Sequence, residues 1–255
     1  MKDKTKNLWM TILAAVLWLL VWQLAYALVG SDLLLSSPKT VLLRLGELLS
    51  TSSFYQIIGR SFLRIMAGFL IGTALGIVLG ALAQVHPFLE KFISFPVSVI
   101  KATPVASFVI LALMWLTGRN LSIFICTLVV LPMMYQSVRQ GLASVPAELH
   151  EMAFVYRLSP LKKLKSLYMP AVWPYFLASL RVALGFVWKA GVAAEVIATP
   201  KGTIGKMLHD AKVYLETGDL FAWTFVVILL SVLIEKGMMA LVDLLAKRGR
   251  RRAKE

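Results

Sequence analysis

Charged residues, cysteine and histidine are all scarce in this 255-residue sequence. Only 16% of the residues are charged, whereas a soluble domain typically has about a quarter. Cys126 is the single cysteine, so an internal disulfide is impossible. The three histidines, His86, His150 and His209, lie far apart in the chain, and no cluster of metal-binding cysteines accompanies them. These shortages argue against a soluble domain, a disulfide-stabilised fold and a metal site.

Long apolar runs dominate the sequence instead, since hydrophobic residues make up 59% of it. A membrane-spanning helix needs about 20 mostly apolar residues. The sequence therefore predicts an all-α membrane protein with about six spans, at residues 8–29, 65–85, 92–118, 121–138, 171–197 and 220–245. The first run has a basic flank and an Ala25-Tyr26-Ala27 triplet, which together resemble a cleaved signal peptide. Because the run is long for a signal, we expect an uncleaved first span.

Basic residues outnumber acidic residues by 27 to 13, which gives a net charge of +14. They are scattered over loops and tails, where they favour a cytoplasmic position and contact with anionic lipid rather than with nucleic acid. If six spans begin inside the cell, fifteen basic residues lie on the inner side: Lys2, Lys4, Lys6, Lys91, Arg139, Arg157, Lys162, Lys163, Lys165, Lys247, Arg248, Arg250, Arg251, Arg252 and Lys254. Seven lie on the outer side: Lys39, Arg44, Arg60, Arg119, Lys201, Lys206 and Lys212. This bias predicts that both termini are cytoplasmic.

A polar stretch, residues 144–170, separates the fourth and fifth apolar runs and falls on the predicted cytoplasmic side. Pro146 suits the first position of a helix, and Glu148 and Glu151 suit its early turns, where the helix dipole favours negative charge. Ser159-Pro160 is a typical start for a second helix, with a capping hydroxyl followed by proline. We therefore expect two short surface helices, which either rest on lipid headgroups or form a docking surface for a soluble partner.

The same stretch resembles the cytoplasmic loop of the membrane subunits of bacterial ABC importers. That loop has the pattern Glu-Ala-Ala, three residues, Gly, nine residues, Ile, one residue, Leu-Pro. Here Glu151-Met152-Ala153 is followed by Arg157 at the glycine position, Leu167 at the isoleucine position and Met169-Pro170 at the end, where the fifth span starts. The spacing is complete. Arg157 is the largest departure, because a left-handed turn costs arginine more than glycine, so the turn is a place where this chain can differ in shape.

Further stretches carry the resemblance toward the nitrate/sulfonate/taurine-type permeases. They are RVALGFVWKAGVAAEVIATPKGTIGKML at residues 181–208 and the earlier SPKTVLLRLGELL and SFLRIMAGFLIGTALGIVLGAL. The resemblance covers most of residues 35–245. It implies a multi-pass protein of the bacterial inner membrane with a single transmembrane permease domain, residues 1–255. Taken together with the apolar runs, it predicts within that domain a core at 60–245, a first span at 8–29 and a coupling loop at 144–170.

In such importers the coupling helices sit in a groove of the ATP-binding subunits, and closure of those subunits moves the spans. The resemblance therefore implies two copies of an ATP-binding subunit, which carry ATP and Mg, and no cofactor in this chain. It also implies a second permease copy, most simply the same chain, and an extracytoplasmic substrate-binding protein. The coupling role would fall on Glu148, Glu151, Ala153, Arg157, Ser159, Pro160 and Pro170.

The chain has no sequence motif of an enzyme that would power transport by itself. A phosphate-binding loop needs Gly, four residues, then Gly-Lys-Ser/Thr. The nearest stretch has Pro200 at the first glycine and Met207 at the hydroxyl position after Gly205-Lys206, and it is predicted to lie outside the cell. Zinc-protease and serine-elbow motifs are also missing from the sequence. We expect ATP hydrolysis to belong to a separate subunit.

Four glycines recur at every fourth residue of the second span: Gly68, Gly72, Gly76 and Gly80. Small residues let helix backbones approach closely. The pattern predicts either a static packing seam or a surface on which the spans slide.

Charged residues inside the apolar runs are candidates for a translocation path: Lys101, Arg181, Lys189 and Glu195. A charge near the bilayer centre costs about 2.5 to 3.5 kcal/mol on insertion scales. Arg181 lies about 16 Å along the fifth span, near mid-depth, where it either serves the path or bonds to a neighbouring helix. Lys189 and Glu195 lie nearer the outer end, where long side chains can snorkel to water.

Lys101 lies between Pro96 and Pro104, in a part of the third span that we expect to be broken. Irregular backbone at membrane depth usually lines a cavity or is covered by protein. Arg64, at the start of the second span, is expected to act as an interface anchor.

Cations in the path favour an oxyanion substrate, and sulfonate, taurine, nitrate and bicarbonate all fit the resemblance. Some permeases of this type carry neutral vitamin precursors, which stand as the alternative substrate class. An ion-driven secondary transporter is the rival function, although it would need internal repeats that we do not detect. An intramembrane enzyme would need paired acidic, histidine or serine groups at mid-depth, and Glu195 is the single acidic candidate in the fifth span.

Overall fold

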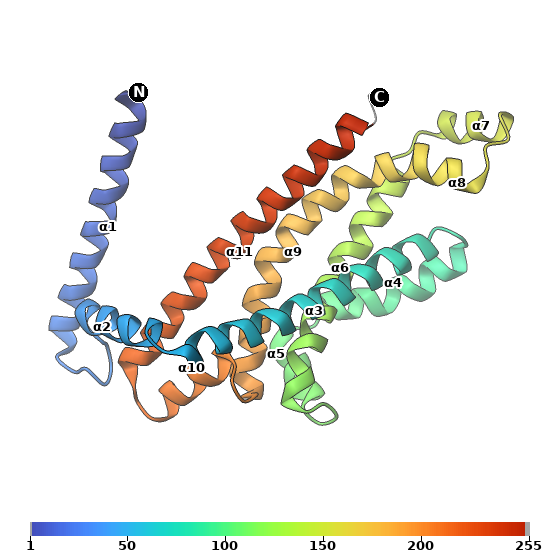
Figure 1. Cartoon of the computed structure of the whole chain (residues 1–255). Coiled ribbons are helices and arrows are strands. Elements are labelled where there is room, and N and C mark those ends of the chain that lie inside the picture. The colour runs from blue at the N-terminus through green and yellow to red at the C-terminus, as the bar shows by residue number, and fades with distance from the viewer. Residues whose placement is uncertain (1, 253–255) are drawn as a thin grey trace.

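The computed structural model describes residues 2–252, with side chains described for residues 9–118 and 120–240. Every regular element of this described part is a helix (Figure 1). In chain order these are α1 (Lys2–Val29), α2 (Pro38–Leu49), α3 (Ser52–Leu82), α4 (Pro87–Ala102), α5 (Val105–Ala112), α6 (Gly118–Ala143), α7 (Ala147–Val155), α8 (Pro160–Lys163), a π-helical turn (Leu164–Tyr168), α9 (Met169–Ala198), α10 (Ile204–Val213) and α11 (Thr217–Arg252).

Six of these segments account for the predicted spans. Among the described residues, five helical runs are long and apolar enough to cross a membrane: Trp9–Val29, Ser52–Leu82, Asn120–Ala143, Pro160–Ala198 and Thr217–Ala240. The sixth is the pair α4 and α5, which passes the same test together but bends by 101° at its break. The expected all-α architecture with about six spans is confirmed, and so is the break in the third span.

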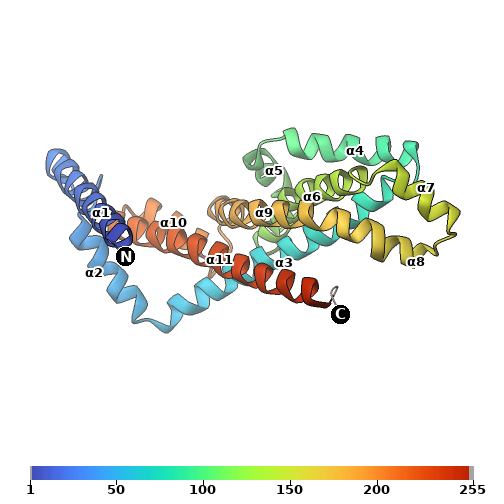
Figure 2. The same ribbon diagram turned by 90° about the horizontal axis from the view of Figure 1, so that it is seen from above.

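The helices alternate in direction (Figure 1). α1, the α4–α5 pair and α9 run one way, and α3, α6 and α11 run back. As a result, the start of α1, the end of α11 and the α7–α8 hairpin lie on one side, while α2 and α10 lie on the other. Seen from above, α7 and α8 are at the opposite end of the molecule from α1 (Figure 2). The hairpin thus follows the fourth span, as expected, on the same side as the start of α1 and the end of α11.

The second span is longer than its apolar core suggests. α3 begins at Ser52, whereas the apolar run begins at Ile65. Arg60, which we expected in an outer loop, and Arg64, which we expected at the start of the span, both lie inside the helix, and the Nη1 atom of Arg64 is buried. Hydropathy marks where uncharged residues begin, but a helix continues through polar residues wherever its backbone hydrogen bonds are satisfied.

The short helices α2 and α10 were not expected from the sequence. Each begins at a hydroxyl residue that accepts a backbone hydrogen bond, as N-cap residues do. The Ser37 hydroxyl accepts from the Thr40 amide at 3.1 Å, and the Thr203 hydroxyl accepts from the Lys206 amide at 3.3 Å. Both helices are too short to span a bilayer and lie on the side away from α7–α8.

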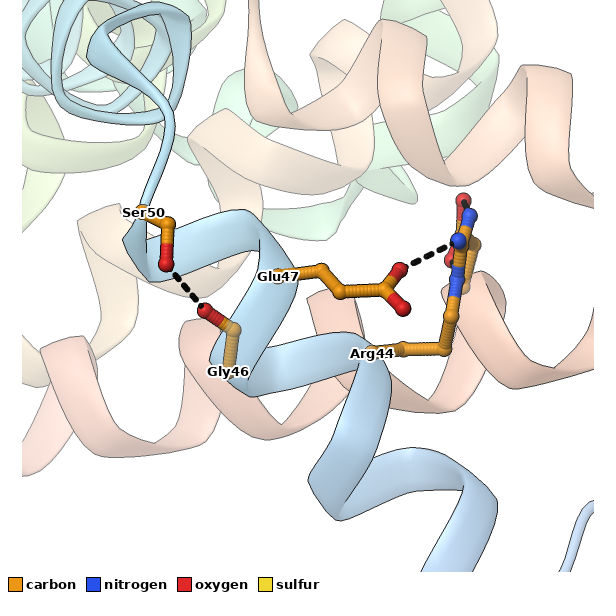
Figure 3. A network of polar contacts seen from close by, with 5 residues as sticks. Arg44, Gly46, Glu47 and Ser50 are labelled. Atoms are coloured by element: carbon orange, nitrogen blue, oxygen red, sulfur yellow. Dashed lines mark hydrogen bonds and ion pairs between the residues drawn. The ribbon is translucent and has the colours of Figure 1, made fainter.

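α2 is fixed to α11 by a charged pair. The Arg44 guanidinium donates to both carboxylate oxygens of Asp219, at 2.5 and 2.8 Å, and to Glu47 at 2.6 Å. Figure 3 shows Arg44 facing Glu47, with the Ser50 hydroxyl directed at the Gly46 carbonyl near the end of the same helix. The Asp219 carboxylate raises the pKa of Arg44, helped by Glu47, so this arginine stays charged.

The core lies where α3, α6 and α9 pack together. Ile65 of α3, Cys126 of α6 and Trp188 of α9 are all buried there. The four glycines of α3 face α6, and a Cβ added at any of them would lie within 3.0 Å of an α6 atom. Gly68, Gly72, Gly76 and Gly80 therefore form a close packing seam, which the expected glycine spacing indicated.

A buried carboxylate joins α3, α9 and α10. Glu195, near the end of α9, has no exposed surface. Its Oε2 atom accepts from the Ser61 hydroxyl at 2.7 Å and from the Gly205 amide at 3.4 Å. The Ser61 oxygen in turn accepts from the Ile204 amide at 2.9 Å. We expected Glu195 to snorkel toward water, and that expectation is wrong, because α10 folds back over it.

Candidate functional site

The α7–α8 hairpin projects from the membrane-spanning helices (Figures 1 and 2). α7 follows Pro146, as expected, although this proline takes the N-cap position and not the first helical position. Glu148 and Glu151 lie on α7 and are exposed. Ala153 is buried, with 1% of its surface exposed, so it belongs to the inner face of the same helix. The Glu-Met-Ala segment thus presents its carboxylate outward and its small residue inward.

The turn after α7 is a left-handed helix cap centred on Arg157. Its φ angle is +47°, the region where glycine is usually found. The Leu158 amide donates to the Ala153 carbonyl and the Arg157 amide donates to the Phe154 carbonyl, both at 3.0 Å. These two bonds are those of a Schellman motif. The arginine therefore adopts the turn that glycine would make, and the concern that it would change the backbone path is not supported here.

We expect Arg157→Gly to stabilise this turn by about 0.5 to 1 kcal/mol, because it removes the steric cost of a positive φ at a side-chain-bearing residue. Hydrogen exchange of residues 147–160 should slow in the variant. Leu158→Gly is the matched control, since Leu158 has no positive φ, and it should speed exchange. Faster exchange in Arg157→Gly would mean that the arginine side chain contributes more to the hairpin than its backbone strain costs.

The second half of the hairpin differs from the expectation in two details. Ser159 stands at the N-cap of α8, before Pro160, but its hydroxyl makes no capping hydrogen bond. Pro170 does not separate α8 from the fifth span, because α8, the π-helical turn and α9 form one continuous helical run from Pro160 to Ala198. A π turn absorbs an extra residue near a proline that lacks an amide hydrogen, so the helix continues without a break.

The tip of the hairpin is apolar and exposed. Phe154, Val155, Tyr156 and Leu161 each have at least 74% of their surface exposed. Exposed patches of large apolar side chains are typical of surfaces that bind another protein or a membrane. The acidic residues of α7 and the lysines of α8 border this tip.

The base of the hairpin is fixed to the spans. A Cβ added at Gly141 would lie 2.5 Å from the Cα atom of Val172, so α6 and α9 cross in direct backbone contact there. The ring centroids of His150, on α7, and Tyr168, in the π-helical turn, lie 5.7 Å apart. On α6, Arg139 forms an ion pair with Glu90 of α4. The hairpin is therefore anchored where α6 and α9 contact each other.

A cavity of about 660 Å³ opens at the break between α4 and α5. Its walls come from the end of α4, the start of α5, and the facing sides of α6 and α9. Among its lining residues, the polar ones are Lys101, Thr103, Gln136 and Ser179. Lys101 was a candidate from the sequence. Gln136 and Ser179 were missed, because uncharged polar residues inside apolar runs give no signal until the fold brings them together.

The other path candidates do not line this cavity. Arg181 and Lys189 are on exposed parts of α9. Arg181 is two residues from Ser179 and next to Val182, which do line it. Glu195 lies in the buried joint described above. The structure brings Lys101 together with α6 and α9, and it does not bring the four charged candidates into one cluster.

Comparisons with known proteins agree with this architecture. The profile of the family described as "Binding-protein-dependent transport system inner membrane component" matches residues 72–251. The chain is 28% identical over 204 residues to a Bacillus subtilis (strain 168) protein named as an aliphatic sulfonates transport permease, covering 79% of this chain and 74% of the relative. It is 27% identical over 214 residues to the nitrate import permease of Synechococcus elongatus, covering 80% and 75%. It is 27% identical over 233 residues to the taurine transport system permease of Escherichia coli (strain K12), covering 89% and 84%.

A solved structure shares the fold. The crystal structure of an amino acid ABC transporter with histidines superposes with a TM-score of 0.64 at 13% sequence identity, covering 80% of this chain and 97% of that chain.

Proposed function

Because the chain belongs to the family of binding-protein-dependent transport system inner membrane components, we propose that its α7–α8 hairpin is the surface that a separate ATP-binding subunit grips in an ATP-driven importer. The observation that carries this proposal is the projecting hairpin itself. It combines exposed carboxylates, an exposed apolar tip and a hydrogen-bonded capped turn, and its sequence resembles the coupling loop of ABC importers. ATP and Mg would bind the partner.

The helices offer a direct route from the hairpin to the cavity. α8 continues through the π-helical turn into α9, which carries Ser179 at the cavity wall. α6 leads from the hairpin to Gln136 on the facing wall. Closure of the ATP-binding subunits would pull on both helices at once and change the separation of these walls. This mechanism needs rigid helices and a firm base, and the Gly141–Val172 contact supplies the base.

The orientation follows from the same proposal. With the hairpin in the cytoplasm, the start of α1 and the end of α11 are cytoplasmic too, and α2 and α10 face the outside. The lysines of the hairpin, Lys162, Lys163 and Lys165, then obey the positive-inside rule. The basic N-terminal and C-terminal residues of the orientation count lie outside the described side chains. The substrate-binding protein would approach the α2 and α10 side.

A complete path would form between two such chains, since a bundle of this size is small and closed twofold symmetry is the commonest oligomer. We propose a homodimer of permeases with two ATP-binding subunits. The solute would be small and anionic, which the names of the sulfonate, nitrate and taurine relatives support. Lys101, Arg181 and Lys189 are the cations of this chain proposed to attract it.

Glu151→Arg tests the coupling role. We expect the variant to lose about tenfold or more of its affinity for the ATP-binding subunit, because a reversed charge in an interface leaves its former partner unpaired. Co-purification of the two subunits and substrate-stimulated ATPase activity in proteoliposomes both measure it. Glu216→Arg is the matched control, since Glu216 is also exposed but lies between α10 and α11 on the opposite side.

The control variant should assemble as the parent does. Equal co-purification and equal ATPase activity in Glu151→Arg would remove the hairpin carboxylate from the interface. Equal losses in both variants would point to a general effect of charge reversal on insertion.

A further inference from the structure

We propose that the cavity at the α4–α5 break binds an organic anion with one negative head group and an apolar body, and that Lys101 holds the head group. This inference rests on the proposed import function and narrows its substrate class. An aliphatic sulfonate and an aliphatic carboxylate share the required chemistry. Nitrate, bicarbonate and a zwitterion such as taurine do not.

The size of the cavity is the first argument. Its volume is about 660 Å³, within the range of roughly 300 to 1,000 Å³ that is typical of sites for small organic molecules. An inorganic ion of four heavy atoms needs on the order of two water volumes, about 60 Å³. Nitrate or bicarbonate would leave most of this space empty or filled with water.

The lining is the second argument. Thirteen of the seventeen lining residues are apolar, and they include Phe108, Phe186 and Met133. Apolar walls cannot replace the hydration shell that surrounds a small inorganic ion on all sides. They do favour a hydrocarbon body, because its transfer out of water is favourable. The cavity is thus suited to a solute that carries charge at one end and carbon over most of its surface.

The placement of charge is the third argument. Lys101 is the single ionisable side chain among the lining residues, and it lies at the end of α4, beside the break. Gln136 of α6 and Ser179 of α9 add hydrogen-bond donors from the facing helices. The Thr103 hydroxyl donates to the Val99 carbonyl at 2.8 Å, so its proton is already used. The cation and two neutral donors that each chain supplies suit one monovalent head group.

The lining also opposes a second, positive group on the solute. No carboxylate is among the lining residues, all of which lie in the part of the chain whose side chains are described. Glu90 of α4 does not line the cavity, and its carboxylate forms an ion pair with Arg139. The ammonium group of a zwitterion would therefore receive no counter-charge from this chain's lining, which is costly in an apolar site.

Lys101 could instead serve only its own helix, because a cation in the last turn complements the helix dipole. Binding measurements separate this role from ligand binding. The full chain, purified in a neutral detergent as the complex with its ATP-binding subunit, is titrated with hexanesulfonate, hexanoate, nitrate, taurine and the neutral analogue hexanamide. Bound ligand is detected by the rise in the thermal unfolding midpoint.

We expect hexanesulfonate or hexanoate to raise the midpoint, and the ranking of these two identifies the preferred head group. Nitrate, taurine and hexanamide should give no comparable rise at equal concentration and ionic strength.

Lys101→Met should weaken binding of the organic anion by about tenfold to a hundredfold, because it removes a charged hydrogen bond but keeps the side-chain length. Lys101→Arg should retain binding. Ala178→Trp should abolish it by filling the cavity from α9.

A failure of this ligand inference can be distinguished from a failure of the proposed import function. Nitrate binding as strong as hexanesulfonate binding would overturn the organic body, and equal binding of hexanamide would overturn the charge. Unchanged affinity in both Lys101→Met and Ala178→Trp would remove the ligand from this cavity. In each case an intact complex with the ATP-binding subunit leaves the importer assignment standing, whereas failure of the parent chain to assemble would contradict that assignment.

Discussion

Replacing Gly68 with leucine should destabilise the chain strongly. A Cβ atom at this position would lie 2.5 Å from the Ile123 carbonyl oxygen and 2.5 Å from the Cβ atom of Cys126. The first of these is backbone, so α6 cannot yield by rotating a side chain. The whole of α6 would have to move away from α3, and the buried residues between them would lose their contacts. Overpacking of this kind costs about 3 kcal/mol or more, a large part of the stability of a typical domain.

The measurement is the yield of monodisperse protein after extraction, followed by the thermal unfolding midpoint. Gly59→Leu is the matched control, because Gly59 lies on the same helix but nothing is within 4 Å of its added Cβ. We expect the control to behave as the parent does, and Gly68→Ala to fall between the two variants. Normal yield and midpoint for Gly68→Leu would contradict the α3–α6 seam.

The spans were predictable because they rest on a local property. Each needs about 20 apolar residues, and that count can be read along the chain. The break in the third span was also predictable, since Pro104 removes an amide and restricts the residue before it. The same rule does not place every break, because Pro96, Pro132 and Pro174 all lie inside helices of the structure. Neighbouring helices stabilise such positions, and the sequence does not show which neighbours are present.

The hairpin was predicted better than the cavity for a similar reason. Its start signals and its turn lie within a few residues of one another, and the loop pattern that this stretch resembles has glycine at the position of Arg157, whose φ angle is +47° in the structure. The cavity depends on Lys101, Gln136 and Ser179, which come from three helices. Two of these residues are uncharged and sit in apolar runs, where nothing in the sequence distinguishes them from lipid-facing residues.

Glu195 shows where hydropathy misleads. A carboxylate near the end of an apolar run is usually placed near water, and the prediction followed that rule. The turn at residues 199–203 instead brings α10 back over the end of α9. Gly205 permits this approach, since a Cβ there would lie 2.3 Å from the Glu195 carbonyl carbon. The signal was present as a hydroxyl cap at Thr203 followed by Gly205, but its partner could not be identified from the sequence.

Glu195→Ala should therefore lower stability strongly. The substitution removes the acceptor of the Ser61 hydroxyl and of the Gly205 amide, and both donors lie in a buried region. Each unsatisfied donor costs about 1 to 3 kcal/mol, and the space left by the side chain adds to this. We expect a total loss of about 3 kcal/mol or more in the free energy of unfolding. Glu195→Gln should lose less, because its amide oxygen can accept the same bonds. Lys189→Ala is the control on the same helix, since Lys189 is exposed.

In Glu195→Ala, α10 should lose its stability before the rest of the chain unfolds. Ser61 and Glu195 accept the hydrogen bonds of the first α10 amides and do not contact the hairpin. Hydrogen exchange at Ile204 and Gly205 should therefore speed up in Glu195→Ala under conditions where residues 147–160 keep their protection. Such a variant would still bind the ATP-binding subunit while its opposite face loosens. Equal protection of α10 in Glu195→Ala and Lys189→Ala would show that the buried carboxylate does not hold α10 in place. Loss of protection at the hairpin in the same experiment would show that the two faces unfold as one unit.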